Sequence, residues 1–301
     1  MLKVFHSDRF VPTLPEGHRF PIEKYRLVRE QLLYEGTLSE HHLEESHRVA
    51  EEAILRIHER YYWESIRELK LDERALRKIG FPQSPQLVER SQRSTQGTLS
   101  AAIQAASSGI GMNIAGGTHH AYSGHGEGFC ILNDLAIGSK YLLENNLAKQ
   151  ILIVDLDVHQ GNGTAKIFED EERVFTFSMH GEKNYPLKKE KSDIDIDLAT
   201  GMQDDEYLNI LDDQLPRLIK KVKPDFVFYQ SGVDVLETDS LGKLSLSREG
   251  CKKRDALVIE TMAEMEIPLA VCIGGGYSSK LSDTVEAHSN TFRIAADVYG
   301  T

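Results

Sequence analysis

Cysteine is scarce in this 301-residue chain, and the few cysteines lack the spacing of a structural motif. Cys130, Cys251 and Cys272 are odd in number, and no two of them form a C-x-x-C pair. A disulfide framework or a structural zinc knot would need paired or closely spaced cysteines, so both are disfavoured. The cysteine content favours a reducing compartment.

Long apolar runs and an excess of positive charge are also missing. The N-terminus, MLKVFHSDRF, contains no stretch like a signal peptide, and no window approaches the roughly 18 consecutive apolar residues of a membrane span. The chain carries 35 Lys and Arg against 47 Asp and Glu, a formal charge of −12, and has no like-charge tail. We therefore predict a cytoplasmic protein with no membrane or nucleic-acid partner, whose acidity would suit a cationic substrate.

Strand-like and helix-like segments alternate along the chain. Runs rich in β-branched and aromatic residues predict strands at LKVFHS, ILIVDLD, RVFTFSM, DFVFYQSG and IPLAVCIGG. Alternation with helices gives right-handed crossovers in a mostly parallel sheet that is covered on both faces. Because large α/β sheets reach this length as one unit, we predict an α/β fold and a single domain over residues 1–301.

Helical patterns occupy six segments. Ser39 is a possible cap for the helix over 39–60, and Pro216 should kink the helix over 204–222. Residues 80–97 are expected to be the longest irregular stretch. The predicted helices are 39–60, 98–107, 132–144, 204–222, 247–266 and 279–297.

Polar residues stand where the predicted strands end. Asp155, Asp157 and His159 lie at the end of ILIVDLD, and alternation along a strand puts the two aspartates on the same side. Ligands of parallel sheets bind beyond the carboxyl ends of the strands, so polar residues there are candidates for a site. The others at this edge are His119, His120, Asp234 and Tyr277.

Three of these residues could bind a divalent cation. Asp157, His159 and Asp234 would supply two oxygens and one nitrogen and leave positions open, as in catalytic zinc sites. A D-x-H pattern alone is more often structural, with aspartates that cap helices and a histidine that packs in the core. The histidine pair, the second strand-end aspartate and the glycine-flanked tyrosine favour the metal site.

The chain resembles the zinc-dependent histone deacetylase superfamily. GHRFP, GGTHHAYSGHGEGFCILND, DLDVHQGNG, FSMH, SGVD and GGGYS occur in the order and approximate spacing of that family. GMQDDEYL and GVDVLETDSLGKLSLSREGCKKRDALV are most similar to class IV histone deacetylases and their bacterial homologues. The resemblance implies an arginase/deacetylase-like fold with an eight-stranded, mostly parallel sheet.

The same resemblance implies catalytic roles. His120 would be the general base and would later protonate the leaving amine, while His119 would pair with Asp155. Tyr277 would donate its hydroxyl to the oxyanion. A zinc ion would activate water and polarise the acyl carbonyl. The implied ligands of one zinc ion (Zn²⁺) per chain are Asp157, His159 and Asp234.

Two further assignments come from this resemblance. Asn162 would take the place of the aspartate that orients the base histidine in class I enzymes, although an asparagine between two glycines also suits a turn. A potassium ion (K⁺) would support the zinc ligands. Its implied ligands are Asp155, backbone oxygens of Asp157 and His159, Ser178 and the Met179 carbonyl.

The resemblance also implies a tunnel for an acyl-lysine side chain. Its aromatic residues could equally be ordinary core residues, and its glycines an ordinary turn. His18 and Arg19 are expected near an internal acyl pocket. The implied substrate-binding residues are Gly128, Phe129, Tyr185, Gly275 and Gly276.

Three functions stay open on the sequence. The first is a zinc-dependent amidohydrolase that removes acetyl or longer fatty acyl groups from lysine side chains in proteins. The second is a deacetylase of small acylated amines such as acetylpolyamines, and the third is a non-catalytic module that binds acyl-lysine. The module is disfavoured because every implied ligand, the base and the tyrosine are present. A binuclear arginase-type site would need further carboxylates.

Overall fold

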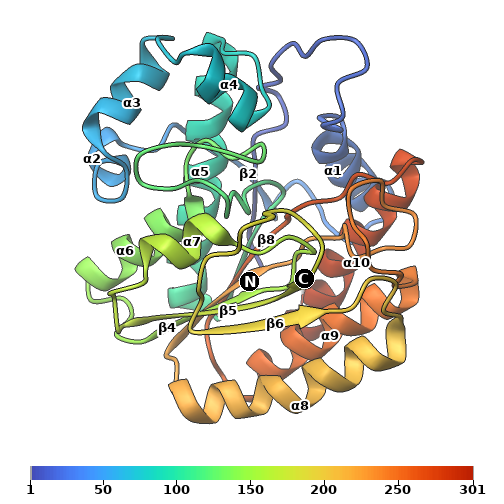
Figure 1. The fold of residues 1–301 in the computed structure, drawn as a ribbon. Helices are drawn as coiled ribbons and strands as arrows, with labels where there is room; N and C mark the ends of the chain where they lie inside the picture. Colours follow the sequence, from blue (N-terminus) through green and yellow to red (C-terminus); the bar gives the residue numbers. More distant parts are fainter. Residues whose placement is uncertain (1, 301) are drawn as a thin grey trace.

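Within the described residues, 2–300, eight strands form one parallel sheet at the centre of this computed structural model (Figure 1). The strand order is β2-β1-β3-β8-β7-β4-β5-β6. The predicted α/β fold with a parallel sheet is therefore confirmed. The strands are β1 (Val4–His6), β2 (Leu43–Glu45), β3 (Ile110–Asn113), β4 (Ile151–Asp155), β5 (Val174–Gly181), β6 (Ile194–Leu198), β7 (Phe226–Gln230) and β8 (Leu269–Cys272).

Helices cover both faces of this sheet (Figure 1). On one face α5 packs against α6, and on the other α10 contacts both α1 and α9, while α8 packs against α9. No helix within residues 2–300 combines the length and the hydrophobicity that crossing a bilayer would require. The helices are α1 (Lys24–Tyr34), α2 (Glu51–Ile54), α3 (Arg60–Arg67), α4 (Glu73–Ile79), α5 (Pro85–Ser108), α6 (Asp134–Glu144), α7 (Asn162–Ile167), α8 (Asp204–Val222), α9 (Arg248–Glu264) and α10 (Leu281–Tyr299).

The central strands are apolar on both sides because both sides are covered. In β4, Ile151 and Ile153 pack into a cluster with residues of α5 and α6, whereas Leu152 and Val154 pack with residues of α8 and α9. Burial on both faces explains the continuous apolar run before the first aspartate. At the end of this strand the polar residues begin.

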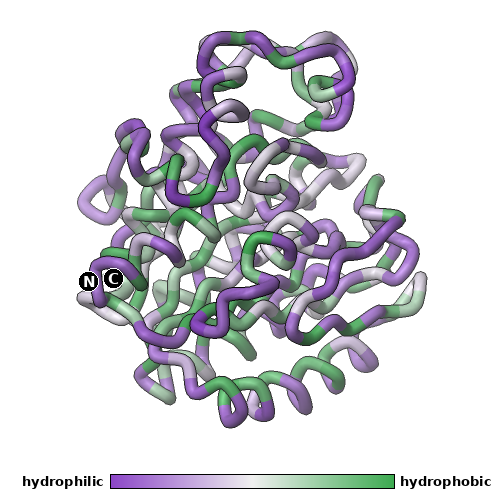
Figure 2. Tube along the Cα trace, turned by 60° about the vertical axis from the view of Figure 1, so that its left-hand side comes forward, coloured by the Kyte–Doolittle hydropathy of each residue, from purple (hydrophilic) through white to green (hydrophobic). Residues whose placement is uncertain are grey.

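Helix α8 is amphipathic, as its leucine spacing predicts. Leu211, Leu215 and Leu218 are buried, and the polar positions between them face solvent. The lowest helix in Figure 2 alternates accordingly between hydrophobic and hydrophilic positions. The helix continues through Pro216 to Val222.

The predicted helix over 39–60 is wrong. Leu43–Glu45 instead forms β2, the edge strand, which pairs with β1, and only the four residues Glu51–Ile54 and the first residue of α3 are helical in this range. An edge strand is stabilised by hydrogen bonds to its neighbour, which the local residue pattern does not reveal.

The irregular stretch predicted over 80–97 is also wrong in most of its length. Helix α5 begins at Pro85, because the Ser84 hydroxyl accepts a hydrogen bond from the backbone N–H of Leu87 and proline fits the first helical position. The Ser-Pro pair was a helix start signal, so this boundary was readable from the sequence.

Candidate metal and catalytic site

Asp157, His159 and Asp234 converge beyond the carboxyl ends of β4 and β7. These strands are neighbours, and Asp155 pairs with Gln230 where they end. One ligand atom from each of the three residues lies within 4.8 Å of the others. The His159 Nδ1 atom is 3.1 Å from an oxygen of Asp157 and 3.1 Å from an oxygen of Asp234.

This cluster fits a divalent cation. All three side chains are buried, and burial together with the charge of Asp157 raises the pKa of Asp234 to about 7. A cation between the two carboxylates would relieve that repulsion, and oxygen and nitrogen donors with open positions suit zinc. Gly275 leaves the necessary room, because a Cβ there would collide with the Asp234 carboxylate.

Backbone groups orient the carboxylates. The N–H of Gly275 donates to Asp157 Oδ2 at 2.7 Å, and the N–H of Val158 donates to Asp234 Oδ1 at 2.9 Å. Each carboxylate therefore keeps another oxygen near His159 Nδ1. Second partners of this kind fix the direction in which a ligand oxygen points.

Arg254 on α9 supports both loops that carry the candidate ligands, and sequence analysis missed it. Its buried guanidinium donates to the carbonyl of Leu156 at 3.2 Å and to the carbonyl of Gly232 at 2.5 Å. Leu156 lies between Asp155 and Asp157, and Gly232 precedes Asp234 by two residues. One side chain thus connects the two segments that carry the candidate ligands.

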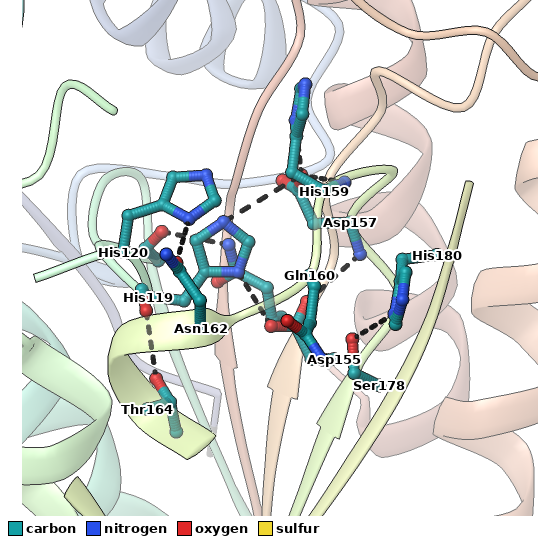
Figure 3. A network of polar contacts seen from close by, with 12 residues as sticks. His119, His120, Asp155, Asp157, His159, Gln160, Asn162, Thr164, Ser178 and His180 are labelled. Atoms are coloured by element: carbon teal, nitrogen blue, oxygen red, sulfur yellow. Dashed lines mark hydrogen bonds and ion pairs between the residues drawn. The ribbon is translucent and has the colours of Figure 1, made fainter. Parts of the chain in front are cut away.

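His119 and Asp155 form a buried ion pair beside the cluster. His119 Nδ1 lies 2.6 Å from Asp155 Oδ2 (Figure 3). Burial lowers the pKa of His119, but the carboxylates of Asp155 and Asp157 outweigh it and raise the pKa to about 9. His119 is therefore a cation at neutral pH.

His120 has the opposite electrostatics. Burial, and then the positive charge of His119, hold its pKa well below the usual range, so the imidazole is neutral. Its Nδ1 atom lies 2.7 Å from Asn162 Oδ1 (Figure 3). A neutral imidazole in this position can accept a proton.

Glu127 is a further residue that sequence analysis missed, although it stands in the GHGEGFC segment. Its buried carboxylate accepts a hydrogen bond from the Asn162 amide. It also forms an ion pair with Lys78, whose Nζ atom lies 2.5 Å from Oε2. Because a carboxylate only accepts, the Asn162 NH₂ faces Glu127 and the Asn162 carbonyl faces His120. His120 Nδ1 then carries the proton, and Nε2 is left as the free base.

Tyr277 lines the same cavities as His120 and His159. Its backbone N–H donates to Asp239 at 2.6 Å, and the buried amine of Lys24 donates to the Gly274 carbonyl at 2.9 Å. Burial raises the pKa of the phenol well above its usual range, so the hydroxyl keeps its proton and remains a donor. A Cβ on Gly276, whose φ is +153°, would meet Val233 and Thr284, so only glycine fits before the tyrosine.

The residues expected around potassium lie on β4 and β5. Asp155 and Ser178 are direct partners across these strands, and Met179 follows in β5. The Ser178 hydroxyl is 2.9 Å from His180 Nδ1 (Figure 3). The potassium site itself stays a prediction.

The expected tunnel residues line an outer cavity of about 600 Å³ that reaches His120. Gly128, Phe129 and Tyr185 all contribute to it. The Tyr185 ring lies perpendicular to the His120 ring at 5.0 Å, and a Cβ on Gly128 would meet His120 Cδ2 at 2.5 Å. The glycine therefore lets the chain pass close to the imidazole.

An inner cavity adjoins the outer one, and His120, His159 and Tyr277 line both. It extends to α5, where Leu87 and the buried Arg90 line it, with the Arg90 guanidinium 4.3 Å from the Tyr25 ring centre. His18 stacks on Phe81, which also lines this cavity. His18 and Arg19 both line the outer cavity, and Arg19 does so from an exposed loop next to Phe20 of the inner cavity. Their place near an acyl pocket stays a prediction.

A parallel sheet that carries aspartate and histidine side chains at its carboxyl edge, beside a histidine pair, is an α/β fold with a candidate site for a divalent metal ion. Residues 18–292 match the histone deacetylase domain family, so the chain belongs to that family. It is 45% identical over 296 residues to an uncharacterized protein of Picosynechococcus sp., with 98% of each chain covered. It is 28% identical over 282 residues to histone deacetylase 2 of Arabidopsis thaliana, with 89% of this chain and 73% of the relative covered. The crystal structure of an HDAC homologue from Aquifex aeolicus has the same fold, with a TM-score of 0.84 at 24% identity over 99% of this chain and 84% of the other.

Proposed function

We propose that this chain is a zinc-dependent deacylase that hydrolyses the amide between an acyl group and the side-chain amine of lysine in proteins. The observation that carries the proposal is the convergence of Asp157, His159 and Asp234 next to a neutral His120. We further propose one catalytic domain over residues 1–301, a class IV relationship, potassium as a second ion and a cytoplasmic location.

The chain's own residues divide the chemistry among them. Asp157, His159 and Asp234 would hold the zinc ion, which when bound would supply a Lewis acid for the acyl carbonyl and lower the pKa of the attacking water. His120 would accept a proton at Nε2 from the water that attacks the acyl carbon and would return one to the leaving amine. Tyr277 donates its hydroxyl to the oxygen on which negative charge develops.

Purified protein loaded with zinc should cleave acyl-lysine peptides, lose the activity to a chelator and regain it when zinc is restored. Mass spectrometry of a peptide panel, with acetylpolyamines as a second panel, measures this directly. Tight binding of the peptides without turnover would favour the non-catalytic module instead. Turnover of acetylpolyamines alone would favour the small-amine deacetylase.

Longer acyl groups should be preferred to acetyl. We expect acyl-lysines of roughly eight or more carbons to have the higher kcat/KM, since each methylene contributes about 0.8 kcal/mol where the pocket accommodates it. The inner cavity, of about 60 Å³, must widen to hold such a chain. Rates on otherwise identical acetyl, octanoyl and myristoyl peptides test this. Equal or faster cleavage of the acetyl peptide would contradict it and leave a plain deacetylase.

Glu127 is proposed to position His120 by fixing the orientation of the Asn162 amide. Glu127→Ala removes the charged acceptor of the Asn162 NH₂ and leaves only the Tyr122 hydroxyl, 3.1 Å away, which can donate as well as accept. The amide can then turn and offer a donor to His120 Nδ1. We expect kcat to fall about 10-fold, with KM and zinc content unchanged, in line with losses at other supporting groups.

Glu127→Gln is the matched variant. Its side-chain carbonyl can still accept from Asn162, so most of the lost rate should return. If both variants lose the same rate, or if both lose zinc, Glu127 does not act through the orientation of Asn162.

A further inference from the structure

The mouth of the outer cavity is strongly basic, although the chain as a whole is acidic. Five cationic side chains are among the residues that line this cavity, and the lining contains no aspartate or glutamate. The whole chain has 47 acidic residues against 35 basic ones, so a mixed lining would be expected. The five cations are Arg19, Arg77, Lys78, Lys183 and Lys243.

These cations come from four separate segments of the chain. Arg19 precedes α1, and Arg77 and Lys78 lie in the last turn of α4. Lys183 follows β5, and Lys243 lies in the loop before α9. All five are exposed. Convergence of unrelated segments on one opening makes this a feature of the folded mouth and not a charge run on a single helix face.

Part of this charge has no counterion. Arg77 pairs with Glu73, Lys78 with Glu127 and Lys183 with Glu182. Within residues 2–300, Arg19 and Lys243 form no ion pair, and the amine of Lys243 donates only to the Lys183 carbonyl, at 2.7 Å. Two uncompensated positive charges therefore remain at the opening.

The outer cavity connects this mouth to the candidate catalytic residues. His120, His159 and Tyr277 line its inner end, and Tyr185 and the fully exposed Leu187 line it nearer to solvent. A substrate that reaches the zinc site must pass the cations. Their field attracts anions and repels cations over about 8 Å at physiological salt.

We infer that the substrate is an acyl-lysine in an acidic protein segment, with aspartate or glutamate next to the modified lysine. This inference rests on the proposed deacylase function and narrows it. A polyamine that still carries positive charge beside its acylated end would be repelled at the mouth. The local charge here is the reverse of the net charge that led us to expect a cationic substrate.

Three peptides of one length test the inference on the zinc-loaded protein. They carry the same acyl-lysine, flanked on both sides by aspartate, by serine or by lysine, and a monoacetylated polyamine is the fourth substrate. We expect kcat/KM for the aspartate peptide to exceed that for the lysine peptide about 10-fold. The ratio should shrink between about 0.05 M and about 0.5 M salt, because salt screens exposed charges.

A charge-reversal variant tests whether the cations at the mouth cause the preference for the aspartate peptide. Arg19→Glu combined with Lys243→Glu should abolish or reverse the ratio, whereas Lys220→Glu on the exposed side of α8 should leave it unchanged. Equal rates on the three peptides, or faster cleavage of the polyamine, would overturn the inference while the enzyme remains a deacylase. If no substrate is cleaved although zinc is bound, the proposed function is wrong and the inference with it.

Discussion

Asp234→Ala is expected to purify without zinc, whereas the unaltered protein should hold about one zinc ion per chain. Removal of one of three ligands leaves Asp157 and His159, which cannot hold a divalent cation in an open site. Affinity should fall by more than the roughly 100-fold that loss of a supporting group causes. Elemental analysis of both proteins after gel filtration measures the metal content.

Melting temperature gives a readout independent of activity. A ligand present at about 100 times its Kd stabilises the folded state by about 2.7 kcal/mol, so zinc should raise the Tm of the unaltered protein. The Asp234→Ala variant should show no such rise. Asp212→Ala, an exposed position on α8, is the control and should keep both zinc and the shift. An unchanged zinc content in Asp234→Ala would exclude Asp234 from the site.

Much of this site could be predicted because strand geometry is simple. Residues that follow parallel strands share one edge of the sheet, so Asp157, His159 and Asp234 had to lie near one another once their strands were neighbours. The family motifs then paired His120 with Asn162 and His119 with Asp155, and the structure brings each pair within hydrogen-bond distance.

The supporting residues could not be predicted because they reach the site from distant elements. Lys24 contacts a carbonyl 250 residues away, and Arg254 reaches two loops from α9. Nothing in the local sequence of a helix indicates which charged side chain turns inward. Only the packing of that helix on the sheet decides it.

Glu127 could not be assigned a role from the sequence either, although it lies inside a recognised motif. Its neighbours Gly128 and Phe129 carried the family pattern, but a carboxylate between glycines suggests a turn as readily as a partner for Asn162. The basic mouth is invisible for a similar reason. Its cations are separated by up to 224 residues in the chain, and composition predicts the opposite charge.

Tyr277→Phe is expected to lower kcat by roughly 100-fold or more, or about 2.7 kcal/mol, while zinc content and KM stay near those of the unaltered protein. The phenol keeps its proton because burial, and then the nearby Asp234 and Asp157, raise its pKa. If it meets the acyl oxygen only when negative charge develops there, its loss affects the transition state and not the bound substrate. His120→Ala should reduce kcat comparably by removing the proton carrier.

The alternative is that Tyr277 only packs against its neighbours. Its ring lies 5.9 Å from Phe129 and 6.4 Å from Phe20, and the Lys24 amine is 5.4 Å from its centre. Phenylalanine preserves all of these ring contacts, so a packing role predicts near-normal turnover with at most a small change in Tm. Measured together, kcat, KM, Tm and zinc content separate the two roles, because only an oxyanion donor loses kcat alone. Near-normal kcat in the phenylalanine variant would remove Tyr277 from the mechanism and leave oxyanion stabilisation to the metal.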